Sequence, residues 1–323
     1  MTIARNQIID AEQPCFYHCF NRCVQRARLC GFDPITGKNF NHRKIWIEER
    51  IIQLSNCFSI DLYAYAVMDN HYHIVLLLDP KGSANWSDDE VVERWLNTRT
   101  KPMTPNAKTT QKAALLKNAK KVKEIRERLS SLSWFMSKLN TPIASMSNKE
   151  DDVTGHFWAS RFQSIPLLDE TAAIACMAYT DLNPLKAGAA QSLSKSKFTS
   201  IQKRLLQSSK SGIDSTNHPI KPLNSSLSIR PLHTSLSDYL EMVSIAASAL
   251  QFERKNIKFT EELLKKLSLH KSIWPLNLEY FGSVKTAIGS PKHLRKIAKK
   301  RQQHSISGIR LARKAYDDDK KDP

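Results

Sequence analysis

The amino-acid sequence predicts an α+β domain up to about residue 190, followed by a smaller helical region. Two apolar segments of strand length, 60–68 and 71–78, are separated only by Asp69-Asn70. Because Asp and Asn tolerate tight-turn geometry, these segments predict an antiparallel hairpin. The alternating segment CFYHCFNR at 15–22 predicts a further strand.

Helices are expected between and after these strands. Apolar residues recur with helical spacing from Arg43 to Ser55, and the segment from Phe157 to Pro166 reads as another strand. Asp169 is an N-cap residue for a helix that is expected to end at Leu182, because Pro184 disfavours helical geometry in the residue before it.

A helical insert is predicted at about 80–150, between the hairpin and the next strand. It holds a short helix from Asp88 to Leu96 and a strongly basic helical stretch from Gln111 to Leu139. A solvated helix face and a DNA-facing one explain the basic stretch equally well.

The composition changes beyond residue 190. Residues 191–237 are dense in Ser, Lys, Asn and Pro, which predicts a loop-rich linker. Residues 238–316 predict a helical C-terminal domain of unknown role, with helices at 238–250, 261–269 and 291–316. A polar tail, 317–323, ends the chain.

Charge is the first indication of a partner. The 323 residues contain 49 Lys and Arg against 31 Asp and Glu, a formal net charge of +18. Such an excess attracts polyanions and favours nucleic acid, although a solvated basic surface or an acidic protein partner would also fit. With no apolar run of membrane length and no signal-peptide core, we expect a cytoplasmic protein.

Six cysteines are present, without any CxxC spacing. Cys15, Cys19 and Cys23 recur every four residues, which could indicate metal binding, but buried thiols in a reducing compartment are the favoured interpretation.

The segment His71-Tyr72-His73 is the first candidate for chemistry. On a strand, residues two apart share a face, so both imidazoles project together while Tyr72 points away. Such a pair can hold a divalent metal and leave other coordination positions open. Taken alone the pair is a weak signal, since incidental pairs are at least as common.

Tyr179 and Asn183 form the second candidate cluster. They are four residues apart on the predicted helix and therefore share one face. An amide oxygen can bind a hard metal ion, and a phenol beside that ion can attack a polarised phosphate. An isolated pair of this kind would more often be a half-buried Tyr and a helix-ending Asn.

Three motifs in order, MDNHYHIVLL, GHFWASRFQS and AYTDLNPLKAG, resemble those of the REP-associated tyrosine transposases, which belong to the single-tyrosine HUH transposases. The resemblance covers roughly residues 15–190. It implies a ferredoxin-like antiparallel sheet flanked by helices, the HUH fold. It also implies that His71 and His73 bind the metal, that Tyr179 is the nucleophile and that Asn183 is a third ligand.

The activity implied by the resemblance is cleavage and rejoining of single-stranded DNA, with hairpin-bearing ends as the expected substrate. Tyr179 would attack a backbone phosphate and form a 5′-phosphotyrosine intermediate, and Mg²⁺ or Mn²⁺ is the implied metal. The resemblance further implies a nucleoid-associated enzyme of DNA transposition and recombination. In such an enzyme the tyrosine helix either serves its own subunit or is exchanged between the two subunits of a homodimer.

Five further residues are candidates for DNA contact. His18 and Arg22 lie on the first strand, where they either touch DNA or are ordinary edge polar groups. Trp158 and Arg161 could stack on a base and pair with a phosphate, although core burial is the better expectation for Trp158. Lys186 is placed to reach either DNA or the C-terminus of its helix.

Two other functions compete with strand transfer. A domesticated or inactive protein of the same fold would bind DNA or RNA without cutting it. A different metal-dependent phosphodiesterase would use activated water and leave Tyr179 a structural role. The insert is longer than in compact members of the family, and the roughly 130 residues beyond 190 are additional to them. The role of both segments is open.

Overall fold

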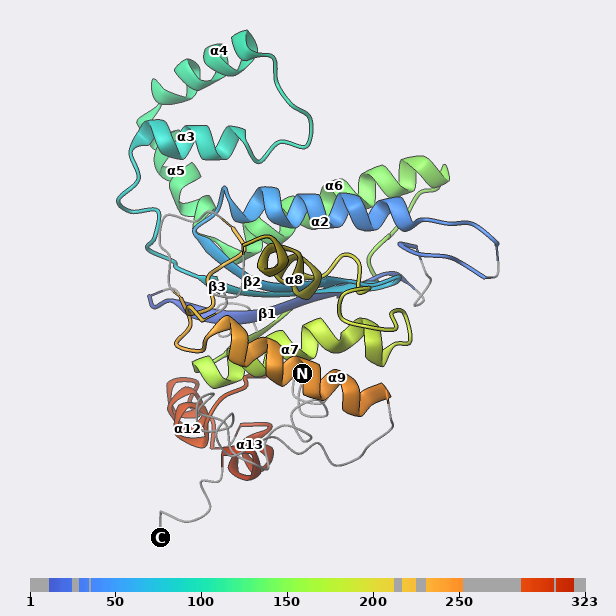
Figure 1. Ribbon diagram of the computed structural model, residues 1–323. Coiled ribbons are helices and arrows are strands. Elements are labelled where there is room, and N and C mark those ends of the chain that lie inside the picture. The colour runs from blue at the N-terminus through green and yellow to red at the C-terminus, as the bar shows by residue number, and fades with distance from the viewer. Residues whose placement is uncertain are drawn as a thin grey trace.

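The computed structural model describes residues 12–24, 29–34, 36–211, 217–224, 231–251, 286–304 and 306–316. Its centre is a four-stranded antiparallel sheet in the order β2-β3-β1-β4, with helices on both faces (Figure 1). The strands are β1 (Cys15–Arg22), β2 (Ile60–Val67), β3 (His71–Leu78) and β4 (Gln163–Leu167).

The order of elements confirms the predicted fold class. Helix α2 (Asn41–Ser55) follows β1, and helix α6 (Leu132–Asp151) precedes β4. The sequence of elements β1-α2-β2-β3-α6-β4, with this strand order, is the ferredoxin-like arrangement. The hairpin of β2 and β3 and the strand at 15–22 are confirmed, and β1 lies in the middle of the sheet, paired with β3 and β4.

The strand predicted at 157–166 is shorter than expected. Regular pairing covers only Gln163–Leu167, and Trp158 forms a single isolated bridge with Cys23. Phe157 to Ala159 still run beside the end of β1, with Val24 N donating to Phe157 O at 3.0 Å and Ala159 N to Arg22 O at 2.8 Å, but a bend at 159–161 interrupts the pairing before β4 begins.

The two faces of the sheet carry different helices. Tyr72, Ile74 and Leu76 of β3 point into a core that α2 and α6 cover. The alternate residues Val75 and Leu77 point into a second core, which helix α7 (Glu170–Lys186) covers. The alternation along β3 therefore assigns His71 and His73 to the α7 face.

The basic stretch predicted as one helical pattern is three helices. They are α4 (Pro105–Leu116), α5 (Ala119–Leu129) and α6, and Asn118 and Ser131 cap the last two. Helix α3 (Asp88–Leu96) lies where a short helix was expected. Many of the basic side chains are paired with acidic ones in the insert: Lys108 with Glu93, Lys112 with Asp89, Lys121 with Glu124, and Arg126 with Asp88.

Helix α7 begins as predicted, since the Asp169 side chain accepts a hydrogen bond from Ala172 N at 2.8 Å. It ends four residues later than predicted, at Lys186, with Pro184 inside. A proline this close to the end removes only one backbone hydrogen bond, and the turn closes through Ala187 N to Asn183 O at 2.9 Å. The burial of Leu182 and Pro184 favours the longer helix.

Where the structure describes it, the segment 191–237, which was predicted as a loop-rich linker, lies along the open edge of β2. It contains helix α8 (Ser200–Ser211). Ser200 hydrogen-bonds Tyr65 N, and Arg204 donates to Tyr63 O at 2.8 Å. Asn224 accepts from Leu62 N and donates to Ile60 O, both at 2.8 Å. The polar composition that suggested a linker supplies the partners of an edge strand.

The opposite edge of the sheet is covered by a segment from much later in the chain. Ile288 N donates to Pro166 O at 2.9 Å and Ile288 O accepts from Leu168 N at 2.8 Å. Gly289 allows the approach, because a Cβ there would lie 2.7 Å from the Cβ of Leu168. Both edges of the sheet are therefore blocked by residues beyond 190.

The C-terminal helices contribute to two cores, since α9 joins the core on the α7 face whereas the buried residues of the last two helices form a small core of their own. Helix α9 (Leu236–Gln251) lies against α7 and contributes Tyr239 and Met242 to the core on that face. Helices α12 (Pro291–Lys300) and α13 (Ile309–Tyr316) replace the single segment expected at 291–316. The predicted helix at 261–269 and the tail at 317–323 lie outside the described residues. None of the described helices has both the length and the apolar composition of a membrane crossing.

One carboxylate joins α7 to the C-terminal helices. Besides capping α7, Asp169 accepts from Ser290 N at 2.7 Å and from the Tyr316 hydroxyl at 2.8 Å. Replacing Asp169 by Ala removes the cap and both of these hydrogen bonds, so we expect a loss of roughly 2–4 kcal/mol in the free energy of unfolding.

Urea denaturation of the purified protein measures this loss. The control is Ser87→Ala, which removes the N-cap of α3 alone and is expected to cost only about 1 kcal/mol. Equal losses in the two variants would show that Asp169 does no more than cap its own helix.

Candidate functional site

His71 and His73 lie side by side on the α7 face of β3. Their ring centroids are 4.9 Å apart and the ring planes are nearly perpendicular, at 87°. Tyr72 points to the other face, where it is fully buried. The geometry expected for alternate residues of a strand is therefore present.

A third histidine, His18, completes this group from the neighbouring strand. Its Nε2 lies 2.9 Å from Nδ1 of His73, and the two rings are stacked. His18 is only 2% exposed, because β1 is a central strand and not an edge. This burial places the His18 ring to orient His73 and leaves it little surface for direct contact with DNA.

The environment keeps the histidines uncharged near neutral pH. Burial lowers the pKa of His18 to about 3, and burial with a contribution from Arg22 lowers the pKa of His71 to about 4. Burial, followed by the neighbouring His18, also holds the pKa of His73 well below its usual value. Neutral imidazole is the form that binds metal ions.

Hydrogen bonds also select which ring nitrogen is available. Nδ1 of His71 lies 2.6 Å from Oδ1 of Asn70, an acceptor, so Nδ1 carries the proton and Nε2 has the lone pair. If Nδ1 of His73 likewise donates to His18, its Nε2 also has a lone pair. Metal-binding histidines commonly donate the second ring N–H to such a partner.

Helix α7 brings Tyr179 to this group. The phenol ring centroid lies 5.6 Å from that of His73 and 6.0 Å from that of His18. The side chain of Asn183, one turn further along, hydrogen-bonds the phenol. Four residues that were identified in two separate parts of the sequence are therefore brought to one place.

The phenol is half-buried, and burial is the main reason why the pKa of Tyr179 is raised. Cys176 raises it further, whereas the hydrogen bond from Asn183 and the charge of Arg22 lower it. The resting side chain is consequently a neutral phenol, with two groups nearby that favour the phenolate.

The orientation of α7 depends on Asp181, a residue that the sequence analysis did not single out. Its carboxylate is fully buried and accepts hydrogen bonds from the hydroxyls of Ser200 and Tyr239, both at 2.5 Å. Burial raises the pKa of Asp181 to about 6, although both hydrogen bonds lower it. The one available signal was an acidic residue within an otherwise apolar helix, two positions after Tyr179.

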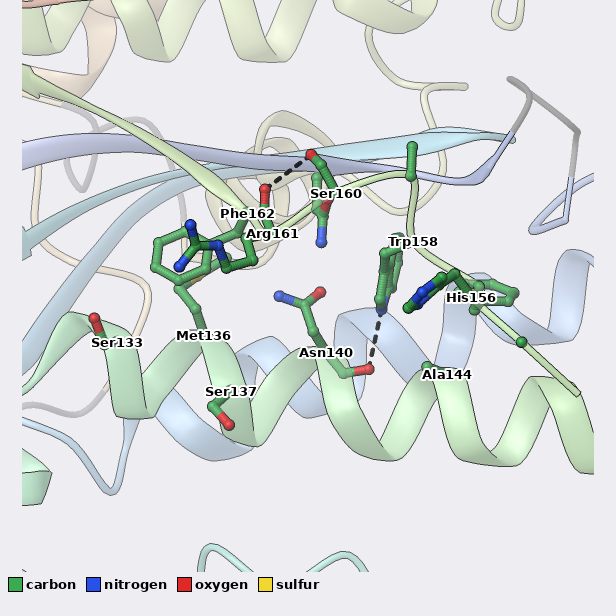
Figure 2. A pocket seen from close by; sticks show the side chains of 14 residues that line it. Ser133, Met136, Ser137, Asn140, Ala144, His156, Trp158, Ser160, Arg161 and Phe162 are labelled. Atoms are coloured by element: carbon green, nitrogen blue, oxygen red, sulfur yellow. Dashed lines mark hydrogen bonds between the residues drawn. The ribbon is translucent and has the colours of Figure 1, made fainter. Parts of the chain in front are cut away.

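The remaining sequence candidates lie in different places. Arg22 is exposed at the end of β1, paired in register with His71, and its charge reaches both imidazoles and Tyr179. Lys186 is exposed at the last position of α7. Trp158 and Arg161 line a pocket beside α6, on the other face of the sheet from Tyr179 (Figure 2).

The metal-binding capacity of the site rests on few donors. In the described ranges, no three His, Cys, Asp or Glu side chains come together as a metal site. The available donors are the imidazoles of His71 and His73 and the amide of Asn183. When two imidazole nitrogens bind one ion with a nitrogen–metal–nitrogen angle of roughly 90°, the ring centroids lie about 5 Å apart. The observed separation of the His71 and His73 centroids, 4.9 Å, agrees with this value.

Exposed positive charge gathers on α12, whose buried side holds Leu294 and Ala298. Its exposed cations are Lys292, Arg295, Lys296, Lys299 and Lys300. The helix is joined to the N-terminal end of α7 through Asp169. Ten residues of helix, about 15 Å, separate that end from Tyr179.

The cysteines do not form the metal site that their spacing could have indicated. Cys19 and Cys23 are buried thiols of the core on the α6 side, and Cys15 is half-buried. The predicted burial is therefore present for Cys19 and Cys23 and partial for Cys15.

No protein-family model and no curated protein matches this chain. Among solved structures, a REP-associated tyrosine transposase bound to a REP hairpin is similar to it, with 14% sequence identity and a TM-score of 0.35. The alignment covers 64% of this chain and 87% of that one.

Proposed function

We propose that this chain cuts and rejoins single-stranded DNA by transesterification, with Tyr179 as the nucleophile. The observation that carries the proposal is the convergence of Tyr179 with His71 and His73 on one face of the sheet. A phenol next to two neutral imidazoles and an amide is a set of groups suited to attack on a phosphate.

In the proposed reaction the Tyr179 oxygen forms a bond to phosphorus while the bond from phosphorus to the 3′-oxygen breaks. The phenol loses its proton and the leaving 3′-oxygen gains one, so the products are a 5′-phosphotyrosine and a free 3′-hydroxyl. Attack by another 3′-hydroxyl reverses the step and joins strands. The hydrogen bond from Asn183 and the charge of Arg22 favour the phenolate form that attacks.

We further propose that His71 and His73 hold a divalent metal, Mg²⁺ or Mn²⁺, with Asn183 as the third ligand. When bound, such an ion supplies positive charge that stabilises the non-bridging oxygens of the phosphate. Imidazole is a better ligand for Mn²⁺ than for Mg²⁺, so a preference for Mn²⁺ is expected. His18 acts as a positioning residue, since its ring holds the orientation of His73.

The substrate class follows from charge. A net charge of +18 and the exposed cations of α12 favour a polyanion, and the insert contributes less because many of its basic side chains are paired with acids. We propose hairpin-bearing single-stranded DNA, with α12 contacting phosphates beyond the cleavage site.

The nucleophile is tested by Tyr179→Phe. Incubation of wild-type protein with a hairpin-bearing single-stranded oligonucleotide and Mn²⁺ should give a covalent protein–DNA band on a denaturing gel, and Tyr179→Phe should give none. Tyr65→Phe is the matched control, because its hydroxyl contacts Glu48 on the other side of the sheet. An adduct formed by Tyr179→Phe would sink the assignment.

The same gel distinguishes the competing functions. Nicked DNA without an adduct would indicate a phosphodiesterase that uses water. DNA that is bound in a native gel but neither nicked nor attached would indicate a binding protein of the same fold.

The metal site is tested by titration of Mn²⁺ in the absence of DNA. His73→Ala should abolish tight binding, and His18→Ala should weaken it by about 10–100-fold, as expected when a ligand loses the residue that orients it. Calorimetry or electron paramagnetic resonance measures the affinity. His42→Ala is the control, since this histidine lies on α2 and pairs with Glu150 of α6. Equal affinities in all three variants would contradict the assignment.

The role of α12 is tested through salt dependence. Replacing Lys292, Lys296 and Lys299 together by Ala should reduce the slope of log K against log salt by about one for each phosphate that the variant no longer neutralises. The control is Lys112→Ala, because this cation is already paired with Asp89 and Glu93. An unchanged slope in the triple variant would exclude α12 from the DNA interface.

A further inference from the structure

A pocket of about 510 Å³ lies between α6 and the segment 155–162, on the face of the sheet opposite to Tyr179 (Figure 2). This volume falls in the range of roughly 300–1,000 Å³ that small-ligand sites occupy. The proposed strand transfer does not use this pocket, yet it holds two of the residues that the sequence marked for nucleic-acid contact, Trp158 and Arg161.

Aromatic side chains form two of its walls. Figure 2 shows Trp158 on one side of the pocket, Phe162 on the other and Asn140 between them. Trp158 is held in place, because its Nε1 donates to Asn140 O at 3.0 Å and its ring packs edge-on against Tyr72, with centroids 5.5 Å apart. A fixed indole that borders an open pocket is suited to stack on a flat ring.

Polar groups accompany these aromatic walls. Oδ1 of Asn140 accepts from the Tyr72 hydroxyl at 2.7 Å, and its amide nitrogen projects into the space between Trp158 and Phe162 in Figure 2. Ser133 and Ser137, on the same face of α6, also line the pocket. An amide donor and two hydroxyls can hydrogen-bond the edge of a nucleobase.

The charge of the pocket suits a nucleotide. Arg161 is exposed at its rim, His156 lies nearby, and no acidic residue is among the described residues that line it. A guanidinium can pair with the phosphate next to a bound base. An uncharged apolar ligand would leave these polar groups and Arg161 unused.

The pocket and the candidate active site lie at the same end of the sheet. Tyr72 lies behind the pocket lining, where its hydroxyl hydrogen-bonds Asn140 and its ring packs against Trp158, and it stands between His71 and His73. Asn21 lines the pocket, and the next residue, Arg22, pairs in register with His71. Residues of the pocket lining and of the candidate active site are thus neighbours along β1 and across the β1–β3 pairing.

We propose that this pocket binds one unstacked nucleobase of the DNA strand that Tyr179 cleaves, with the base stacked on Trp158 and Arg161 on the adjoining phosphate. The inference rests on the proposed function, because it takes single-stranded DNA as the substrate. The pocket would then fix which phosphate lies at Tyr179, because it holds a base a short distance along the DNA strand from that phosphate.

The test uses the full chain in a Tyr179→Phe background, so that binding is measured without cleavage. The probe is a hairpin oligonucleotide with a single-stranded dT tail that carries 2-aminopurine at one position, moved along the tail in successive oligonucleotides. Stacking on Trp158 should change the emission of 2-aminopurine at one or two positions only. Trp158→Ala should abolish that change and weaken binding by about 5–150-fold.

Two further variants keep the test decisive if Trp158→Ala does not fold. Arg161→Ala changes an exposed side chain and should lower the salt-dependence slope by about one. Asn140→Asp keeps an acceptor for the Tyr72 hydroxyl while replacing the amide donor, and should remove the emission change. Trp46→Ala and Arg99→Ala, which lie away from the pocket, are matched controls that should retain both properties.

The results separate this inference from the function on which it rests. If the pocket variants bind as tightly as the parent and still show the parent's change in 2-aminopurine emission, the pocket does not hold a base, whereas adduct formation by wild-type protein would still support strand transfer. If wild-type protein neither binds the oligonucleotides nor forms the adduct, both proposals are wrong.

Discussion

The arrangement of the site depends on the burial of α7 on two sides at once. One side of the helix packs on the sheet, and the other packs under α9, where the buried carboxylate of Asp181 accepts hydrogen bonds from Ser200 and Tyr239. Because a carboxylate in an apolar core needs such partners, α7 has little freedom to rotate about its axis. Tyr179, two residues from Asp181, is thereby held facing the histidines.

The second constraint is the pairing of β1 with β3. In the observed register His18 and His73 are diagonal neighbours on one face, and their ring nitrogens meet at 2.9 Å. A shift of one residue would turn His71 and His73 to the α6 side. The register is therefore as much a part of the site as the histidines, and the apolar residues of β3 that fix it also fix the position of the two imidazoles.

Local patterns were enough to predict the strands at 15–22 and 71–78, the hairpin and the cap at Asp169. The face shared by His71 and His73 also follows from strand periodicity. The roles of Asp181, Ser200 and Asn224 did not follow, because each depends on a partner far away in sequence. Residues 191–237 look like a linker since their Ser, Asn and Lys are polar, yet Ser200 and Asn224 hydrogen-bond the edge of β2.

The residue between the two histidines connects the two faces of the sheet. Besides filling the core, Tyr72 donates a hydrogen bond to the side chain of Asn140, and the backbone carbonyl of Asn140 accepts one from Trp158. Asn140 and Trp158 thus contact β3 through Tyr72, the first by the hydrogen bond with its hydroxyl and the second by the contact with its ring. A change at either residue would reach the strand that carries His71 and His73. In the proposed mechanism, a base held on the α6 face and a phosphate held on the α7 face would be positioned by the same short length of β3.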